Sequence, residues 1–531
     1  MYFERIKNNF NYYTRQYNFD LFSSQKFIQN YNYFKTSSYN LLNRHYVGAK
    51  SLYLFMLILY KFKGFFEDPK LLNDKAYLND IKKNILDCGC ISIKFTQWIV
   101  SKLKGSDNNQ KYKHIIEELE ELFDNCKYHD FKYTRDLFES SFGSQLDDLI
   151  DLKSIKVIAS GSIGQVYKAK FKKDNEYGFD DDIVIKVKHP HIEIIKSYQM
   201  VLINFLRLLQ TNSYFKNRLQ LHINFMDFID LLNKQIDFNI EAYNCNKFYN
   251  IYKNNDYVVI PRVFKYNSDI IISSFEEGEF FFNISEYQKN KVAVNLLSLV
   301  CDMALIENFM HGDLHIKNWK VRKFESDYQI VLYDFGICFE GASVEYNRNL
   351  WNAGETQNVR KMVELFVLNN TNINLKKGDD KTKVIDTLMN TFAEICEEPF
   401  NMNIVFNKLI YIFSINNIII NSVFLNICVF MCLIEDVFKK TNLLCINHNK
   451  KLNMFKIAKN QKLDIIAFCK SHNVYPKLQE YLEERLISLI KEEKDIIKEK
   501  TEDNSLEDRD KIRLFDTFEL SNLKFLNPDE V

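Results

Sequence analysis

The stretch HGDLHIKN at residues His311–Asn318, followed by an Asp-Phe-Gly tripeptide that begins at Asp334, decides the fold predicted for this chain. It supplies two carboxylates and one amide oxygen, those of Asp313, Asp334 and Asn318, at the spacing with which kinase-like folds hold a metal ion and nucleotide phosphates. Between them the pattern predicts two strands, Trp319–Lys323 and Gln329–Tyr333, which return the chain to the same cleft. Oxygen ligands of this kind suit Mg²⁺, and Asp313 can orient or deprotonate an acceptor hydroxyl. We therefore expect phosphoryl-transfer chemistry.

The upstream half of a kinase-like fold is present in the expected order. A run of small residues between two strand patterns predicts a loop whose backbone N–H groups can approach phosphates closely. Its candidate nucleotide contacts are Ala159, Ser160, Gly161, Ser162, Ile163, Gly164 and Gln165. A β-branched strand is predicted at Ile183–Lys188, and in it Lys186 is the expected phosphate-contacting lysine.

That lysine needs a carboxylate partner on a helix. Asp237 and Glu241 lie at i and i+4 of a helical pattern and hence on one predicted face, and Glu241 is the chosen partner of Lys186. Two further strands are predicted, at Val258–Val263 and Ile270–Ser274, and they lead to a hinge where Glu276 is a candidate nucleotide contact.

Each of these motifs has an ordinary explanation in isolation. Lys186 could be an exposed strand lysine, Glu241 a solvated helix residue, and the small-residue run a common hairpin. All of the motifs nevertheless occur once and in order between residues 157 and 336. This order predicts an α+β fold of the protein-kinase type, with a small, mainly β lobe and a large helical lobe.

Three stretches resemble the UbiB/AarF family of atypical protein-kinase-like ATPases. The Ser-Ile-Gly-Gln-Val core at Ser162–Val166 matches the small-residue loop of that family, and Ile93–Gln97 is similar to its Lys-x-Gly-Gln motif, with Thr96 in place of the glycine. The catalytic loop keeps the Asp, His and Asn of the family pattern and lacks its two prolines and its glycine. The resemblance covers about residues 80–440.

The resemblance implies ATP and Mg²⁺ as ligands, an N-terminal helical extension over the active site, and a role near lipid or quinone metabolism at a membrane surface. It also implies a regulatory set, Lys94, Gln97, Gln235 and Asp237. Gln235 stands where the family has a glutamate, which leaves Lys94 without the expected charge partner. The catalytic set is then Asp313, Lys186 and Glu241, and the metal ligands are Asn318 and Asp334.

Two alternative functions remain open. The catalytic loop also resembles that of small-molecule phosphotransferases of the aminoglycoside or choline kinase type, and the altered motifs allow a pseudokinase scaffold that binds nucleotide without turnover. A protein substrate is not indicated, because the chain has no proline between Pro261 and Pro399 and thus no Ala-Pro-Glu segment.

Composition narrows the class further. The 531 residues carry 70 basic and 70 acidic side chains and no basic stripe, which makes nucleic acid an unexpected partner. Eleven cysteines without regular spacing favour a reducing, intracellular compartment, and Met1–Asp20 carries no evident targeting pattern. The apolar stretches Ser51–Tyr60 and Ile418–Ile434 are short or interrupted, so we expect buried helices in place of membrane spans.

Five segments are expected along the chain: an N-terminal helical region at 1–80, the helical extension at 81–154, the small lobe at 155–277, the helical lobe at 278–500 and a charged tail at 501–531.

Overall fold

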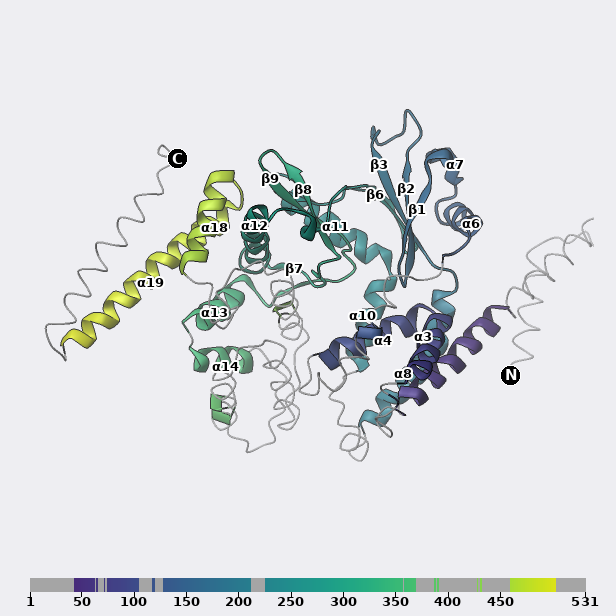
Figure 1. The fold of residues 1–531 in the computed structure, drawn as a ribbon, viewed down its shortest axis with the longest axis horizontal. Coiled ribbons are helices and arrows are strands. Elements are labelled where there is room, and N and C mark those ends of the chain that lie inside the picture. Colours follow the sequence, from purple (N-terminus) through teal and green to yellow (C-terminus); the bar gives the residue numbers. More distant parts are fainter. Residues whose placement is uncertain are drawn as a thin grey trace, which may run out of the picture. The chain divides into compact units, whose positions relative to one another are not determined.

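The computed structural model describes residues 43–62, 74–104, 128–211, 225–356, 358–368 and 459–502, with a few positions between these ranges (64, 71, 117–119, 386–387, 389–390, 427, 430 and 431). The described residues divide into two compact units. One lies within Met1–Ile93 and Pro190–Leu208, and the other within Lys94–His189 and Leu209–Val531 (Figure 1). The five segment boundaries expected from the sequence stay predictions.

The first unit is helical. It contains the helix at 43–62, α3 (Lys75–Cys88), the first turn of α4 (Cys90–Lys104) and most of α8 (Ile192–Thr211). The carboxylate of Asp74 caps α3 by accepting hydrogen bonds from two backbone N–H groups. Ser51, Phe55 and Ile58 are buried, as expected for the helix predicted at Ser51–Tyr60. In the described part of the chain, no helix combines the length and apolar character needed to cross a bilayer.

The second predicted apolar helix, Ile418–Ile434, falls outside the described residues apart from three positions.

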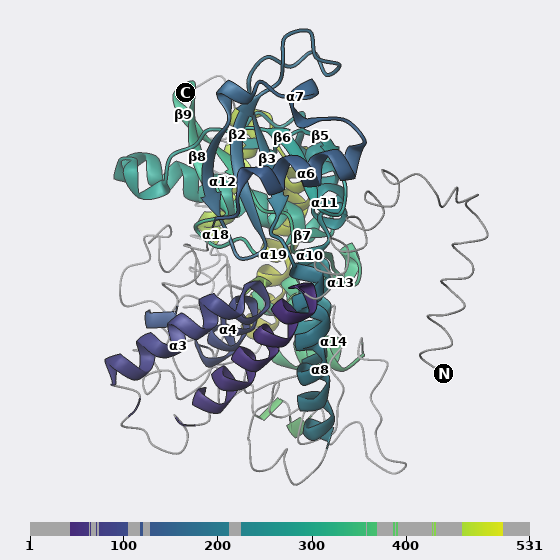
Figure 2. The ribbon, with the colours of Figure 1, turned by 90° about the vertical axis from the view of Figure 1, so that its right-hand side faces the viewer.

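A five-stranded antiparallel sheet forms the small lobe of the second unit, in the order β1-β2-β3-β6-β5. Its strands are β1 (Lys156–Ser160), β2 (Gly164–Lys170), β3 (Asp182–Lys188), β6 (Ile270–Ser274) and β5 (Val263–Tyr266). Alternate residues of β2, β3 and β6 pack against α6 (Phe131–Phe142) and α7 (Leu146–Leu149), which cover one face of the sheet (Figure 2). Lys186 lies opposite Val166 and Ile271 in the register and so faces the other side.

The segment that was predicted as one helix around Asp237 forms two helices, which follow α8 in the chain. α10 (Phe225–Ile236) ends just before Asp237, and α11 (Phe238–Tyr252) begins just after it. The carboxylate of Asp237 accepts a hydrogen bond from the backbone N–H of Asn239, so this residue is the N-cap of α11. The prediction that Asp237 and Glu241 share a helix face was therefore wrong, because Asp favours the cap position, where it satisfies an otherwise free N–H group.

The predicted strand Val258–Val263 is also divided. β4 (Val258–Val259) pairs in parallel with β9 (Asp327–Leu332), and β9 pairs in antiparallel fashion with β8 (Trp319–Phe324). β5 begins only at Val263 and belongs to the small-lobe sheet. Pro261 lies between the two strands, where its missing N–H group ends the ladder. The strands predicted at Trp319–Lys323 and Gln329–Tyr333 are confirmed as β8 and β9, with ends that differ by at most two residues.

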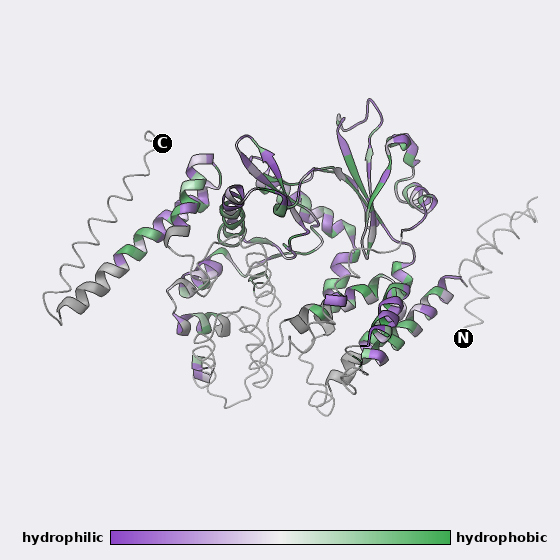
Figure 3. Ribbon diagram, viewed as in Figure 1, coloured by the Kyte–Doolittle hydropathy of each residue, from purple (hydrophilic) through white to green (hydrophobic). Residues whose placement is uncertain are grey.

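The helical lobe is built around α12 (Glu286–Leu305). Its core is apolar and joins α12 to α11, to β8 and β9, and to two C-terminal helices, α18 (Lys459–His472) and α19 (Pro476–Glu502). The coloured part of α19 carries both hydrophilic and hydrophobic residues, and its Leu478, Leu482 and Leu486 lie in that core (Figure 3). The remaining elements are β7 (Phe309–His311), β10 (Cys338–Glu340), α13 (Val344–Glu355), α14 (Val359–Leu368) and two short 3-10 turns at Leu152–Ser154 and Phe281–Asn283.

Candidate active site

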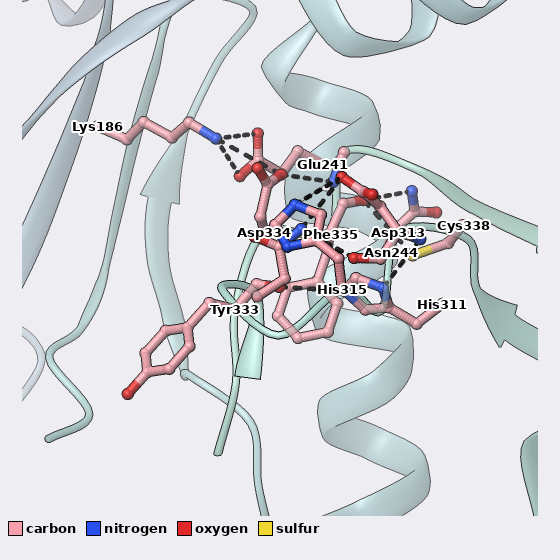
Figure 4. Close-up of polar contacts among 12 residues, drawn as sticks. Lys186, Glu241, Asn244, His311, Asp313, His315, Tyr333, Asp334, Phe335 and Cys338 are labelled. Carbon is pink, nitrogen blue, oxygen red and sulfur yellow. Dashed lines mark hydrogen bonds and ion pairs between the residues drawn. The ribbon is translucent and has the colours of Figure 1, made fainter. Parts of the chain in front are cut away.

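Three of the predicted residues meet beside the sheet. The Lys186 ammonium on β3 donates to both carboxylate oxygens of Glu241 on α11, at 2.6 and 2.8 Å. The same nitrogen lies 3.9 Å from Oδ1 of Asp334 (Figure 4). The Glu241 side chain is 11% exposed and that of Asp334 is 49% exposed. The pair is therefore held inside the fold, while one carboxylate remains open to a ligand.

The charges of this cluster set its protonation states. The Lys186 ammonium lowers the pKa of Asp334 to about 2, against the opposing effect of burial. Burial favours a neutral Lys186 amine, but the charges of Asp334 and Glu241 outweigh it and raise the pKa of Lys186. Burial also raises the pKa of Glu241, although the Lys186 charge acts in the other direction. Asp334 is consequently anionic and Lys186 cationic at neutral pH.

A fully buried imidazole, that of His311, holds the catalytic loop against the end of β9. Its Nδ1 accepts a hydrogen bond from the Asp313 backbone N–H at 3.3 Å, and its Nε2 lies 3.1 Å from the Tyr333 carbonyl. A carbonyl can only accept, so Nε2 carries the proton and the ring is neutral. Burial lowers the pKa of His311, in agreement with a neutral ring. His311 thus links the segment that carries Asp313 to the segment that leads to Asp334.

Asn318 and Asp334 have the character of ligands for Mg²⁺. The Asn318 amide nitrogen donates to the carbonyl and to Oδ2 of Asp313, at 2.9 and 3.1 Å, which leaves the amide oxygen as the atom that can bind a cation. Among the described residues no group of three or more His, Cys, Asp or Glu side chains could hold a metal by itself. Two protein ligands, completed by phosphate oxygens and water, are typical of Mg²⁺ in nucleotide sites. The residues present therefore fit this ion.

The backbone at Asp334 is turned into the left-handed region, with φ of 53°. Its Oδ1 accepts a hydrogen bond from the Gly336 N–H at 3.2 Å, which stabilises this conformation locally. From α11, the Asn244 side chain donates to the Phe335 carbonyl at 2.9 Å. The helix that carries Glu241 is thus bonded directly to the Asp-Phe-Gly segment.

Sequence reasoning missed the roles of Asn244 and His311. A signal for Asn244 was available in the sequence, because it is a polar residue three positions after Glu241 among the apolar residues of one helix face. In the structure Asn244 is 6% exposed. A buried amide of this kind requires hydrogen-bond partners.

The predicted phosphate loop connects β1 to β2. Its turn is closed by a hydrogen bond from the Gly161 N–H to the Gly164 carbonyl at 3.0 Å. Ser160, Ser162 and Ile163 are buried, whereas Ala159 is exposed.

Gln165 differs from the other loop residues. It pairs with Val187 in the register, one position away from the Val166–Lys186 pair, so its side chain points to the face opposite Lys186. Its amide instead accepts from the His129 N–H at 2.8 Å and donates to the Tyr167 hydroxyl at 2.6 Å. The prediction of Gln165 as a nucleotide contact does not hold for its side chain, because the two-residue period of the strand directs it into the core.

Gly164 has a steric role that can be tested. A Cβ atom at Gly164 would lie 2.9 Å from the Val187 carbonyl oxygen and 3.1 Å from the Phe238 ring, whereas one at Gly161 would find no atom closer than 3.7 Å. Gly164→Ala is therefore expected to lower the free energy of unfolding by about 1–3 kcal/mol, and Gly161→Ala should change it far less. Urea denaturation of both variants measures the difference, and equal midpoints would contradict the close packing at Gly164.

Glu276 lies in the connection after β6. Its carboxylate accepts from the Ser274 hydroxyl at 2.7 Å and from the Arg322 guanidinium at 2.8 Å. The Glu276 carbonyl accepts from the Tyr333 hydroxyl at 2.8 Å. The side chain predicted to contact nucleotide is thus already paired, and it joins the connection to β8.

The regulatory set is dispersed. Lys94 lies on α4, and its charge favours the ionised forms of Glu241 and Asp334, as a smaller contribution than those of burial and of Lys186. Asp237 is a helix cap, and Gln97 and Gln235 are half-buried on α4 and α10. The predicted roles of these two glutamines stay predictions.

Comparisons with known proteins find a family model and several similar chains. Residues 121–366 match the family described as the ABC1 atypical kinase-like domain. The chain is 29% identical over 245 residues to the probable serine/threonine-protein kinase abkC of Dictyostelium discoideum, which covers 45% of this chain and 34% of that protein. It is 24% identical over 264 residues to the probable protein kinase UbiB of Aliivibrio fischeri (strain MJ11), which covers 48% of this chain and 47% of that protein. The chain thus spans less than half the length of either relative.

Among solved structures, the chain is similar to Rv3197 of Mycobacterium tuberculosis, determined in complex with erythromycin. The sequence identity is 17% and the TM-score 0.38, over 60% of this chain and 79% of that chain.

Proposed function

Because residues 121–366 of this chain form an ABC1 atypical kinase-like domain, we propose that the protein binds Mg-ATP and catalyses ATP hydrolysis or phosphoryl transfer. The family expected from the sequence is confirmed, and relatives in it are named as probable kinases. The observation that carries the proposal is the contact of Lys186 with Glu241 beside an anionic, half-exposed Asp334. Catalysis of phosphoryl transfer is mainly positioning and charge stabilisation, which such a cluster can provide.

Each residue has one role in this proposal. Lys186 contacts the phosphates of the nucleotide, and Glu241 holds the ammonium in place. Asn318 and Asp334 hold Mg²⁺, which neutralises charge on the phosphate oxygens when it is bound. Asp313 orients water or an acceptor hydroxyl, with its carboxylate fixed by the Asn318 amide.

Nucleotide binding and phosphate release, measured separately on the full chain, test the proposal. Calorimetric titration with Mg-ATP is expected to show saturable binding, and a phosphate assay should show release that depends on Mg²⁺. Binding without release would favour the scaffold alternative, and no binding would overturn the proposal. Formation of ADP that requires an added small alcohol or amine, without release of phosphate, would favour the small-molecule phosphotransferase.

The link to lipid or quinone metabolism at a membrane surface remains part of the proposal. Phe280, Phe282 and Tyr287 are exposed, and the Lys320 ammonium lies 5.1 Å from the Phe280 ring centre. Aromatic and cationic groups exposed together are typical of surfaces that contact anionic lipid. Co-sedimentation with anionic vesicles is expected, and it should weaken in a Phe280→Ser, Phe282→Ser double variant. No co-sedimentation with either kind of vesicle would contradict lipid contact, and equal recovery of both proteins would exclude Phe280 and Phe282 as the contact.

A further inference from the structure

Two imidazoles lie behind the phosphate loop. His129 directly precedes Asp130, the N-cap of α6, and His189 directly follows β3. Their Nδ1 atoms are 2.8 Å apart, and Nε2 of His189 lies 3.0 Å from the Gly161 carbonyl oxygen. The His189 backbone N–H also donates to the Ile163 carbonyl at 2.9 Å. His189 therefore holds the loop at two points.

The direction of these hydrogen bonds follows from elementary chemistry. A carbonyl oxygen only accepts, so Nε2 of His189 carries a proton. If the ring is neutral, its Nδ1 is an acceptor, and Nδ1 of His129 must be the donor. Nε2 of a neutral His129 is then an acceptor, and the Thr134 hydroxyl lies 2.9 Å away to donate to it.

These hydrogen bonds continue as a chain of donors and acceptors, all in one direction, through the core. The Thr134 hydroxyl oxygen accepts from the Tyr167 hydroxyl at 2.7 Å, and the Tyr167 oxygen accepts from the Gln165 amide nitrogen at 2.6 Å. The Gln165 amide oxygen accepts from the backbone N–H of His129 at 2.8 Å. Gln165, Tyr167 and Thr134 are each 1% exposed, so little water competes for these bonds. This hydrogen-bond chain begins at Gln165, which follows the phosphate loop, and ends at the Gly161 carbonyl within that loop.

Neutral rings agree with their surroundings. Burial lowers the pKa of His129 to about 4, with a further contribution from the neighbouring His189, while Asp130 acts weakly in the opposite direction. Burial also lowers the pKa of His189. A second proton on His189 would set two N–H groups against each other at the 2.8 Å contact, whereas one on His129 would lie on Nε2, which faces the Thr134 hydroxyl.

We propose that His189 is a positioning residue for nucleotide binding, and that His129 and the Gln165–Tyr167–Thr134 chain hold its imidazole in the Nε2–H form, which fixes the Gly161 carbonyl. A loop whose carbonyl is bonded to the protein keeps its shape before the nucleotide arrives, and less ordering is then needed on binding. The positioning role rests on the function proposed above, whereas the direction of the hydrogen-bond chain does not.

The tautomers can be observed without any ligand. In ¹⁵N spectra of the histidine-labelled chain near pH 7, His189 is expected as the neutral Nε2–H form and His129 as the neutral Nδ1–H form, which is the minor form of a free imidazole. A charged His189, or a His189 protonated at Nδ1, would overturn the assignment. This result is independent of whether the chain binds ATP.

Two substitutions at His189 separate positioning from bulk. His189→Gln places an amide N–H where Nε2 was, whereas His189→Leu fills similar space without a donor. The Leu variant is expected to raise the Kd for Mg-ATP about tenfold, and the Gln variant should recover most of the loss. Amide hydrogen exchange at Gly161–Gly164, measured without nucleotide, should accelerate in the Leu variant while exchange in α12 does not change. Unchanged exchange at the loop would refute the positioning role even if the wild-type chain failed to bind ATP.

The pair also predicts a pH dependence of stability. The pKa of His129 is about 4 in the folded chain and 6.5 in the reference state, so the unfolded chain binds more protons between these values. Unfolding free energy should therefore fall as the pH is lowered from about 6.5 toward 4. The slope in this window should be shallower in His129→Asn, whose side-chain N–H can still reach His189 and does not titrate. Equal slopes for both proteins would show that His129 is not held neutral.

Discussion

Replacing Asp334 with Asn is expected to lower ATP turnover by at least about 100-fold, because the change removes a half-exposed anion beside Lys186. The amide has the same shape, and its oxygen can still accept the Gly336 N–H that stabilises the left-handed turn. The loss should therefore appear in turnover and in the Mg²⁺ requirement, with little change in unfolding free energy. A phosphate-release assay at several Mg²⁺ concentrations measures it.

Asp147→Asn is a suitable control. Its carboxylate is 41% exposed and pairs with Arg135 at 3.5 Å on the surface, where ion pairs contribute little. This variant should turn over ATP like the parent chain. If Asp334→Asn does so as well, Asp334 is not the metal-binding carboxylate and the proposed function loses its main support.

Replacing Glu241 with Gln is expected to lower turnover by about 10- to 100-fold, the range found when a residue that orients a metal site is lost. Lys186 would lose the charge of a partner at 2.6 Å and retain that of Asp334 at 3.9 Å. The ammonium should then move toward Asp334 and compete with Mg²⁺ for its carboxylate. The distinctive outcome is a higher Mg²⁺ concentration at half-maximal rate.

Glu340→Gln provides the matched comparison. Glu340, on β10, pairs with Lys247, which lies on α11 like Glu241. The Glu340 side chain, however, is 63% exposed. Its loss should affect neither the rate nor the Mg²⁺ dependence. A Glu241→Gln protein with an unchanged Mg²⁺ midpoint would exclude competition by Lys186 as the cause of any lost activity.

The sequence alone was sufficient to predict which residues carry the proposed chemistry and in what order they follow one another. Lys186, Glu241, Asp313, Asn318 and Asp334 could be selected because each belongs to a short motif of characteristic spacing. The β8–β9 hairpin could be predicted for a similar reason, since its strand pattern and its turn are local in the chain. Local geometry of this kind is encoded by neighbouring residues.

The sequence was less informative where two local preferences compete. The helical period at Asp237 and Glu241 suggested one continuous face, but the capping preference of Asp divided the segment in two. The apolar run at Val258–Val263 suggested one strand, but Pro261 separated it into strands of two different sheets. In both cases the residue that ends the element, Asp237 or Pro261, is present in the sequence, but the periodic pattern around it favours a continuous element.

Only the tertiary structure decided which partners the buried polar groups have. Asn244 bonds to Phe335 across 91 positions, and His129 bonds to His189 across 60. No motif indicates such pairs, because they form only after the sheet and its helices have excluded water, when every remaining donor must find an acceptor nearby. The sequence thus determined which groups carry the proposed chemistry, while packing determined which groups hold them in position.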